Sequence, residues 1–124
     1  MNGIILFAHG SRDPLWSKPI ETIAQVVASQ SPTVQVRCAY LELMSPSLET
    51  VVADLARQGI QQIRIVPMFL GVGKHAREDL PELVAALRLT YPAVTLELTP
   101  SIGEHPALIA AIGRIVLADV TTIL

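Results

Sequence analysis

Four short apolar runs alternate with four amphipathic helical patterns, and this alternation is the strongest constraint on the fold. The strand-like runs cover residues 3–8, 33–41, 61–70 and 93–99. Repeated strand–helix units of this kind predict a parallel β-sheet with helices on both faces. With 124 residues, the chain suits one three-layer α/β domain with a single core, covering residues 1–124.

Each helical pattern carries an apolar stripe that is expected to face the sheet. Near the third stripe, Asp79 and Glu82 resemble a capping box, which places the start of that helix near residue 79. Residues 71–78 are then expected to form a loop. The four stripes are Ile20, Ile23, Ala24 and Val27; Leu48, Val51, Val52 and Leu55; Leu80, Leu83, Val84 and Leu87; and Leu108, Ile112, Ile115 and Val116.

The strand patterns also predict the order of the strands. Residues 3–8 and 61–70 are nearly continuous apolar runs, as central strands require, whereas 33–41 and 93–99 alternate like half-exposed edges. With the strands numbered in chain order, the simplest sheet order is 2-1-3-4, which reverses direction between the first and third strands. In open α/β sheets, ligands bind beyond the carboxyl ends of the strands at such a switch point.

Two histidines lie in the two loops at this predicted switch point. His9 follows the first strand, and His75 lies in the loop after the third. Because imidazole binds divalent metals and accepts protons near neutral pH, the pair can hold a metal ion, take up protons, or both. A purely structural role is an equal alternative, and two histidines do not identify a metal, since a firm site needs more ligands.

Three further residues lie at carboxyl ends of strands. Glu42 follows the second strand, from which it can reach the His9 side as a third ligand or a base. By spacing alone, a solvated carboxylate is slightly favoured for Glu42. His105 and Glu104 lie at the start of the last helix, where each can cap the helix or line the rim of the crevice, and capping is the expected role of His105.

Small and charged residues in the same loops are consistent with an anionic ligand, although ordinary surface charge explains the cations equally well. Gly10, Gly71 and Gly73 allow close backbone approach or a positive φ. Neither a Walker loop nor a nucleophile elbow is present, so phosphate binding and hydrolysis by Ser11 are not favoured. The cations are Arg12, Lys18, Lys74 and Arg77.

Composition argues against several classes of function. The net charge of −2 and the scarcity of aromatic residues do not favour nucleic acid as a partner. The single cysteine, Cys38, is expected to pack within a strand in a reducing compartment. No signal peptide and no apolar stretch of roughly 18 residues are found, so we expect a cytoplasmic protein without a membrane partner.

Four motifs together resemble those of the small CbiX-type chelatases, relatives of sirohydrochlorin cobaltochelatase and of the SirB ferrochelatase. They are FAHGSRDP, YLELMSPSL, VPMFLGVGKHAREDLP and SIGEHPAL, in this order over nearly the whole chain. The resemblance implies a single three-layer, chelatase-like (flavodoxin-like) α/β domain. It also implies an ATP-independent chelatase that inserts Co²⁺, with Ni²⁺ or Fe²⁺ possible, into sirohydrochlorin in cobalamin or sirohaem synthesis. The metal is then a substrate, and no tightly bound cofactor is expected.

The resemblance also implies roles for individual residues. His9 and His75 would contact the metal or accept pyrrole protons, assisted by Glu42. The tetrapyrrole carboxylates would be bound near Gly10, Ser11, Arg12, Lys74 and Arg77.

The longer relatives contain two such units, so this chain is expected to form a homodimer. The apolar ending IVLADVTTIL can contribute to that interface, or equally to the core. Two other classes are kept as alternatives: a non-catalytic metal or tetrapyrrole carrier, and a flavodoxin-like nucleotide or phosphate module.

Overall fold

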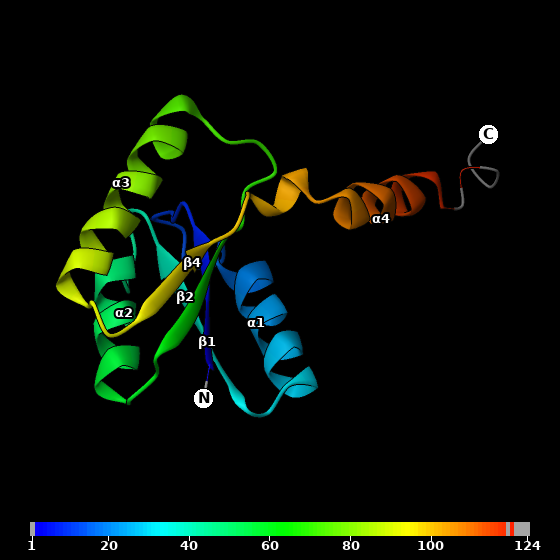
Figure 1. Ribbon diagram of the computed structural model, residues 1–124. Helices are drawn as coiled ribbons and strands as arrows, with labels where there is room; N and C mark the ends of the chain where they lie inside the picture. Colours follow the sequence, from blue (N-terminus) through cyan, green and yellow to red (C-terminus); the bar gives the residue numbers. More distant parts are fainter. Residues whose placement is uncertain (1, 119, 121–124) are drawn as a thin grey trace.

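The computed structural model describes residues 2–118 and 120 and shows a parallel sheet between helices (Figure 1). The sheet order is β2-β1-β3-β4, and each neighbouring pair is parallel. The predicted fold class and strand order are therefore confirmed. The elements are β1 (Asn2–Ala8), α1 (Lys18–Gln30), β2 (Val34–Tyr40), α2 (Leu48–Arg57), β3 (Gln62–Pro67), α3 (Lys74–Thr90), β4 (Thr95–Leu98), the 3₁₀ helix η1 (Ile102–Glu104) and α4 (Pro106–Leu117).

The main core lies between the sheet and the helix pair α2 and α3. Ile5, Phe7 and Ile65 point to this side and are almost completely buried. Burial of each such side chain contributes about 1.5–3 kcal/mol, so this layer supplies most of the packing energy. The predicted stripes of both helices face it, with Leu83 only partly buried. The buried helical residues are Leu48, Val51, Val52, Leu55, Ala76, Leu80, Val84 and Leu87.

Helix α3 begins earlier than predicted, at Lys74 rather than near Asp79. Ala76 and Leu80 lie four residues apart on one side of the helix, and both are buried. Packing against the core therefore holds an additional turn that the local capping signal did not predict. The residues of the expected loop that are helical instead are Lys74, His75, Ala76, Arg77 and Glu78.

The opposite face of the sheet is covered by α1, which packs mainly on β2 and less on β1 (Figure 1). No residue of α1 is buried. Three residues of its predicted stripe, Ile20, Ala24 and Val27, are half-buried, whereas Ile23 is exposed. The stripe thus faces the sheet as predicted, except at Ile23.

Strand β3 occupies the predicted central position but is covered on one side only. Ile63 and Ile65 are buried against the α2 and α3 layer. On the other side, Arg64 is exposed and Val66 is half-buried, because α1 does not extend over β3. The apolar run thus predicted the place of the strand correctly, but not the open face.

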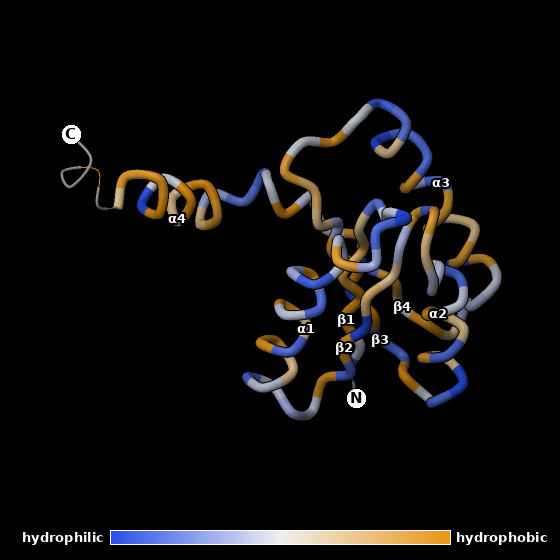
Figure 2. The backbone as a smooth tube through the Cα atoms, turned by 180° about the vertical axis from the view of Figure 1, so that it is seen from behind, coloured by the Kyte–Doolittle hydropathy of each residue, from blue (hydrophilic) through white to orange (hydrophobic). Residues whose placement is uncertain are grey.

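Helix α4 projects away from the domain in both views (Figures 1 and 2). Of the described elements, it packs appreciably only against η1, and none of its residues is buried. Its predicted stripe therefore does not face the sheet, since Leu108 and Ile112 are half-buried and Ile115 and Val116 are exposed. This excludes core packing within the chain for residues 115–117, while residues 119 and 121–124 of the apolar ending lie outside the described residues.

Candidate functional site

Hydrogen bonding between β1 and β2 continues past the strand ends and joins the first two loops of the site. The N–H of Leu41 donates to the carbonyl of Ala8 at 2.9 Å, and that of Glu42 donates to the carbonyl of His9 at 3.0 Å. The His9 and Glu42 residues are both exposed to solvent. The structure therefore brings these two predicted site residues together, as the strand order requires.

The loop after His9 is held tightly against the loop after β2. Gly10 has a φ of +96°, and a Cβ at this position would overlap the carbonyl oxygen of Glu42. The Ser11 N–H donates to Sδ of Met44 at 3.4 Å, and the Ser11 hydroxyl accepts from the N–H of Asp13 at 3.1 Å. Gly10 and Ser11 thus shape the loop, and the close approach at Gly10 is to the protein's own backbone.

Phe69 connects His9 to the core. The His9 and Phe69 rings lie 4.7 Å apart between centroids, and Phe7 packs edge-on against Phe69 at 6.2 Å. His9 follows the alternation by which Ile5 and Phe7 face α2 and α3. The buried ring of Phe69 therefore packs against one side of the His9 imidazole, and the exposed side of the imidazole faces solvent.

A hollow of about 170 Å³ opens beside Phe69, between α3 and the carboxyl ends of β3 and β4. Its walls are largely apolar, with Val72, Leu80 and Leu98 among them. Arg77 and Glu104 bring opposite charges to its lining. The carboxyl edge thus combines an apolar surface with charged groups, which suits a ligand that has an apolar body and ionised substituents.

His75 lies in the first turn of α3, and its side chain is completely exposed. Its Nδ1 is 4.0 Å from Oδ2 of Asp79, one helical turn further on. Within residues 2–118 and 120, no three side chains of His, Cys, Asp or Glu form a group able to hold a metal ion. The two histidines therefore stand at an open edge, where an ion can arrive and leave, and not in a closed metal site.

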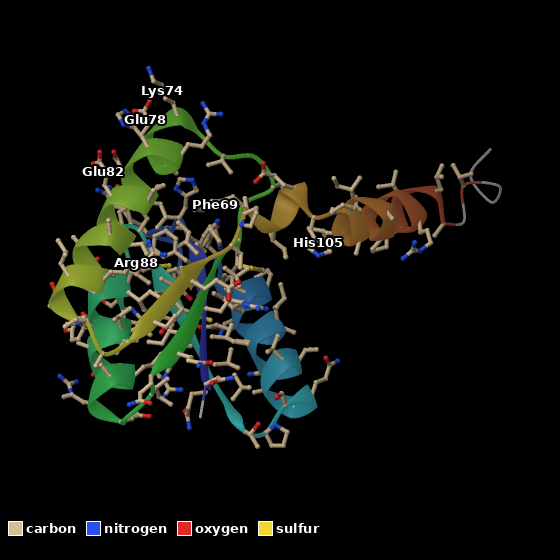
Figure 3. The ribbon with its side chains drawn as sticks, viewed as in Figure 1. Phe69, Lys74, Glu78, Glu82, Arg88 and His105 are labelled. Carbon is tan, nitrogen blue, oxygen red and sulfur yellow. The ribbon has the colours of Figure 1, made fainter. Side chains whose placement is uncertain are left out.

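The predicted cations extend from the same edge. Figure 3 shows Lys74 and Glu78 on the end of α3, well beyond the strands. Arg12, Lys74 and Arg77 are exposed and form no ion pair with any residue the structure describes. Lys18, in contrast, lies 3.8 Å from a carboxylate oxygen of Glu21 on its own helix. Three of the four cations are thus available to an anionic ligand.

The segment between η1 and α4 contributes a structural histidine to this region. The His105 Nδ1 accepts a hydrogen bond of 3.1 Å from the N–H of Ala107, so the expected capping role is confirmed. The Ser101 hydroxyl donates to the carbonyl of Phe69 and ties this segment to the end of β3. Glu104 lines the hollow described above.

Sequence reasoning missed three contributors to this edge: Phe69, Met44 and Asp79. The spacing of Asp79 four residues after His75 was a usable signal, because residues at i and i+4 are neighbours on a helix. No comparable signal existed for Phe69 and Met44. Their contacts with His9 and Ser11 join different loops and depend on the fold.

Cys38 lies outside this edge, beneath α1. Its Sγ is 4.0 Å from the carbonyl of Ile20. Burial, followed by the negative charge of Glu21, raises the pKa of the Cys38 thiol. Since the thiolate is the reactive form, these surroundings fit the expected packing role.

Comparison with solved structures defines the class of this domain. The CbiX protein of Marinobacter aquaeolei VT8, described as one of cobalamin biosynthesis, superposes with a TM-score of 0.85 at 35% identity, over 98% of this chain and 99% of that one. The sirohydrochlorin chelatase SirB of Bacillus subtilis subspecies spizizenii, in complex with cobalt, superposes with a TM-score of 0.76 at 25% identity, over 94% of this chain and 50% of SirB. The fold is therefore that of the chelatase-like α/β domains.

The sequence comparisons are more specific. The CbiX family model matches residues 3–117, so this chain belongs to the CbiX family. The sirohydrochlorin cobaltochelatase of Methanosarcina acetivorans is 34% identical over 83 residues, which are 67% of this chain and 64% of the relative. The chloroplastic sirohydrochlorin ferrochelatase of Arabidopsis thaliana is 26% identical over 112 residues, 90% of this chain and 50% of the relative. The chain thus spans between half and two thirds of these two curated relatives.

Proposed function

We propose that this protein inserts a divalent metal ion, with Co²⁺ as the expected substrate, into sirohydrochlorin without ATP. The observation that carries the proposal is the solvent-open carboxyl edge at which His9 and Glu42 are joined by a hydrogen bond, in a chain of the CbiX family. The names of the relatives support sirohydrochlorin as the macrocycle.

The chemistry requires a base and a weak metal site. Entry of M²⁺ into the macrocycle releases two pyrrole protons, and imidazole accepts protons efficiently near neutral pH. In the proposed mechanism, His9 and His75 receive the ion or these protons, and the Glu42 carboxylate assists His9. Weak binding is an advantage here, because a closed site would retain the ion that must be transferred. No resident cofactor is needed.

The remaining predicted residues would bind the macrocycle. Sirohydrochlorin carries eight carboxylates, which Arg12, Lys74 and Arg77 are placed to meet by charge-assisted hydrogen bonds. Gly10 and Ser11 would form the adjacent loop surface. The apolar lining next to Phe69 offers contact with the ring system.

The size of the hollow favours a homodimer. Pockets that enclose small molecules have volumes of roughly 300–1,000 Å³, whereas the hollow at this edge has about 170 Å³. A single copy therefore offers a partial surface, and we propose that a second copy completes the cleft.

Among the described residues, no helix is both long and apolar enough to cross a bilayer. We place the reaction in the cytoplasm because of the expected reducing environment of the single cysteine.

The direct test is turnover. Sirohydrochlorin and Co²⁺ are mixed with enzyme at a small fraction of their concentration, and the absorbance change of the macrocycle is followed against a reaction without protein. Insertion of many equivalents supports the proposal. A change that stops at one equivalent per protein would indicate a carrier instead. Ni²⁺ and Fe²⁺ in competition then identify the preferred metal.

A further inference from the structure

Helix α4 is an apolar helix that packs appreciably against η1 alone among the elements the structure describes. Arg114 is the single charged residue among its twelve. No residue of α4 is buried, and Ile115 and Val116 are 72% and 70% exposed. A helix that is apolar around most of its circumference is stable in water only when another surface covers it.

The connection to α4 directs the helix away from its own sheet. The N–H of Gly103 donates to the carbonyl of Phe69 at 2.9 Å, and the hydroxyl of Ser101 donates to the same oxygen. Gly103 also lies so close to the backbone of Leu70 that no Cβ would fit. With η1 fixed in this way and His105 capping α4, the helix projects outward (Figures 1 and 2).

The face of the sheet that carries α1 is incompletely covered. Ile4 in the central strand β1 and Val66 in β3 are only half-buried, although central strands of such sheets normally have both faces covered. A hollow of about 280 Å³ lies toward the amino-terminal ends of the strands, lined by Ile4, Arg64 and Glu97 among others. In the part of the chain that the structure describes, no second helix lies beside α1 on this face (Figure 1).

Helix α1 also has a second apolar stripe. Its half-buried stripe packs on β2, while Pro19, Ile23 and Val26 follow an i, i+4, i+7 spacing on the adjoining flank. Ile23 and Val26 are 40% and 49% exposed. An apolar flank of this kind is typical of a helix that packs beside another helix on the same face of a sheet.

We propose that two copies exchange α4, so that the helix of each copy lies beside α1 on the uncovered sheet face of the other. At twelve residues, α4 is about 18 Å long, comparable with the roughly 23 Å of the seven-residue strand β1. The exposed charges of that face, Arg64 and Glu97, form an ion pair with each other at 3.2 Å, so the match between the two surfaces rests on their apolar residues and not on Arg114. The exchange rests on the proposed homodimer and is independent of metal insertion.

Symmetry and size support this occupant over another protein. A two-fold axis makes the same helix-on-sheet contact twice, so the surface buried between the two copies is twice that of one contact. Stable interfaces bury roughly 1,200–2,000 Å² in total. The chain covers 50% of SirB, so a second copy also supplies the length that one copy lacks. Because α4 departs beside η1 at the carboxyl edge, the exchange would bring the partner next to the candidate site.

The first experiment compares Ile115→Asp with Leu89→Asp by light scattering after size exclusion. Leu89 is 85% exposed on α3 and serves as the matched control. The wild type and Leu89→Asp are expected to be dimers, and Ile115→Asp is expected to be monomeric with an unchanged circular dichroism spectrum. Since α4 contributes no residue to the core cluster, the variant should fold. A monomeric wild type would overturn both the exchange and the proposed homodimer.

The second experiment identifies which copy provides the helix. In a Cys38→Ala background, Val26→Cys and Ile115→Cys are placed on separate, differently tagged chains and joined with a short bismaleimide. A linked pair of chains in the mixture, and in neither variant alone, supports the exchange. In a separate sample, a chain that carries both cysteines is mixed with an excess of the Cys38→Ala protein, which has no cysteine. Linking of the two cysteines within the same chain in this sample would overturn the exchange. A dimer that persists in Ile115→Asp would also overturn the exchange. Neither result bears on metal insertion, which the turnover assay tests separately.

Discussion

The N–H of Glu42 donates a hydrogen bond of 3.0 Å to the carbonyl oxygen of His9, beyond the last paired residues of β1 and β2. A main-chain hydrogen bond thus fixes the separation of the two loops, whatever the orientation of the side chains. Gly10 lies directly against the Glu42 carbonyl and makes this contact possible. The position of His9 therefore depends on a residue without a side chain.

Replacement of Gly10 should reveal this dependence. In Gly10→Ala, the Cβ overlaps the Glu42 carbonyl at a φ of +96°, so the loops must separate. We expect a loss of about 1–3 kcal/mol in the free energy of unfolding, measured with urea, and a reduced insertion rate. Gly71→Ala is the control, because its Cβ would meet no atom within 4 Å. Equal stability of the two variants would contradict the proposed close contact.

The two histidines should be needed for insertion but not for folding. Both are exposed, so His9→Ala and His75→Ala should keep their circular dichroism spectra. Each should lower kcat for Co²⁺ insertion by about 100-fold or more, as expected for the loss of a general base. His105→Asn, which retains a cap for α4, is the comparison variant and should remain active. Normal rates in both alanine variants would exclude the two-histidine mechanism.

Glu42→Gln should have a smaller effect than either histidine variant. The substitution removes the charge but preserves the main-chain bond to His9, so the loop should be retained. We expect a decrease of about tenfold in kcat, with a stability close to that of the wild type. The measurement is the initial rate over a range of pH. An unchanged profile would assign Glu42 the role of a solvated carboxylate.

The cations should affect binding more than turnover. Arg12→Ala, Lys74→Ala and Arg77→Ala each remove one exposed charge from the candidate edge, and each should raise KM for sirohydrochlorin up to about fivefold. High salt should raise the wild-type KM as well, since exposed charges are screened. Arg57→Ala, on the exposed part of α2, is the control. A KM that is insensitive to both salt and the three substitutions would argue against an anionic ligand here.

Stability should decrease in alkaline solution because of the groups beneath α1. Burial raises the pKa of Cys38 above the ordinary thiol value of 9.0, and burial raises that of Tyr40 above 10.0. Both groups are neutral when protonated, and the folded state retains the proton more strongly than the unfolded state. Their contribution to the free energy of unfolding is therefore fully present below pH 9, and it is lost as the pH rises through their raised folded-state pKa values.

Urea unfolding between pH 8 and 11 measures this effect. The free energy of unfolding should decrease over this interval, and Cys38→Ala should reduce the slope without abolishing it, because Tyr40 still titrates. The comparison concerns slopes, since the substitution also alters packing near Ile20. An identical slope in Cys38→Ala would show that the thiol does not contribute.

The amino-acid sequence by itself determined the strand order, the buried faces of α2 and α3 and the edge on which His9 and Glu42 lie. Hydrophobic periodicity carries this information, because each apolar position reports whether its own side chain needs to be buried. The sequence also predicted the capping role of His105, because a cap is a contact between residues that are close in sequence.

Contacts between distant segments were decided only by the tertiary structure. The early start of α3 depends on the burial of Ala76, and the orientation of His9 depends on the ring of Phe69. The apolar stripe of α4 predicted packing against the sheet, whereas in the structure the helix projects away from that sheet and none of its residues is buried. Periodicity shows that a side chain must leave water, whereas the surface that receives it is set by the path of the chain through η1.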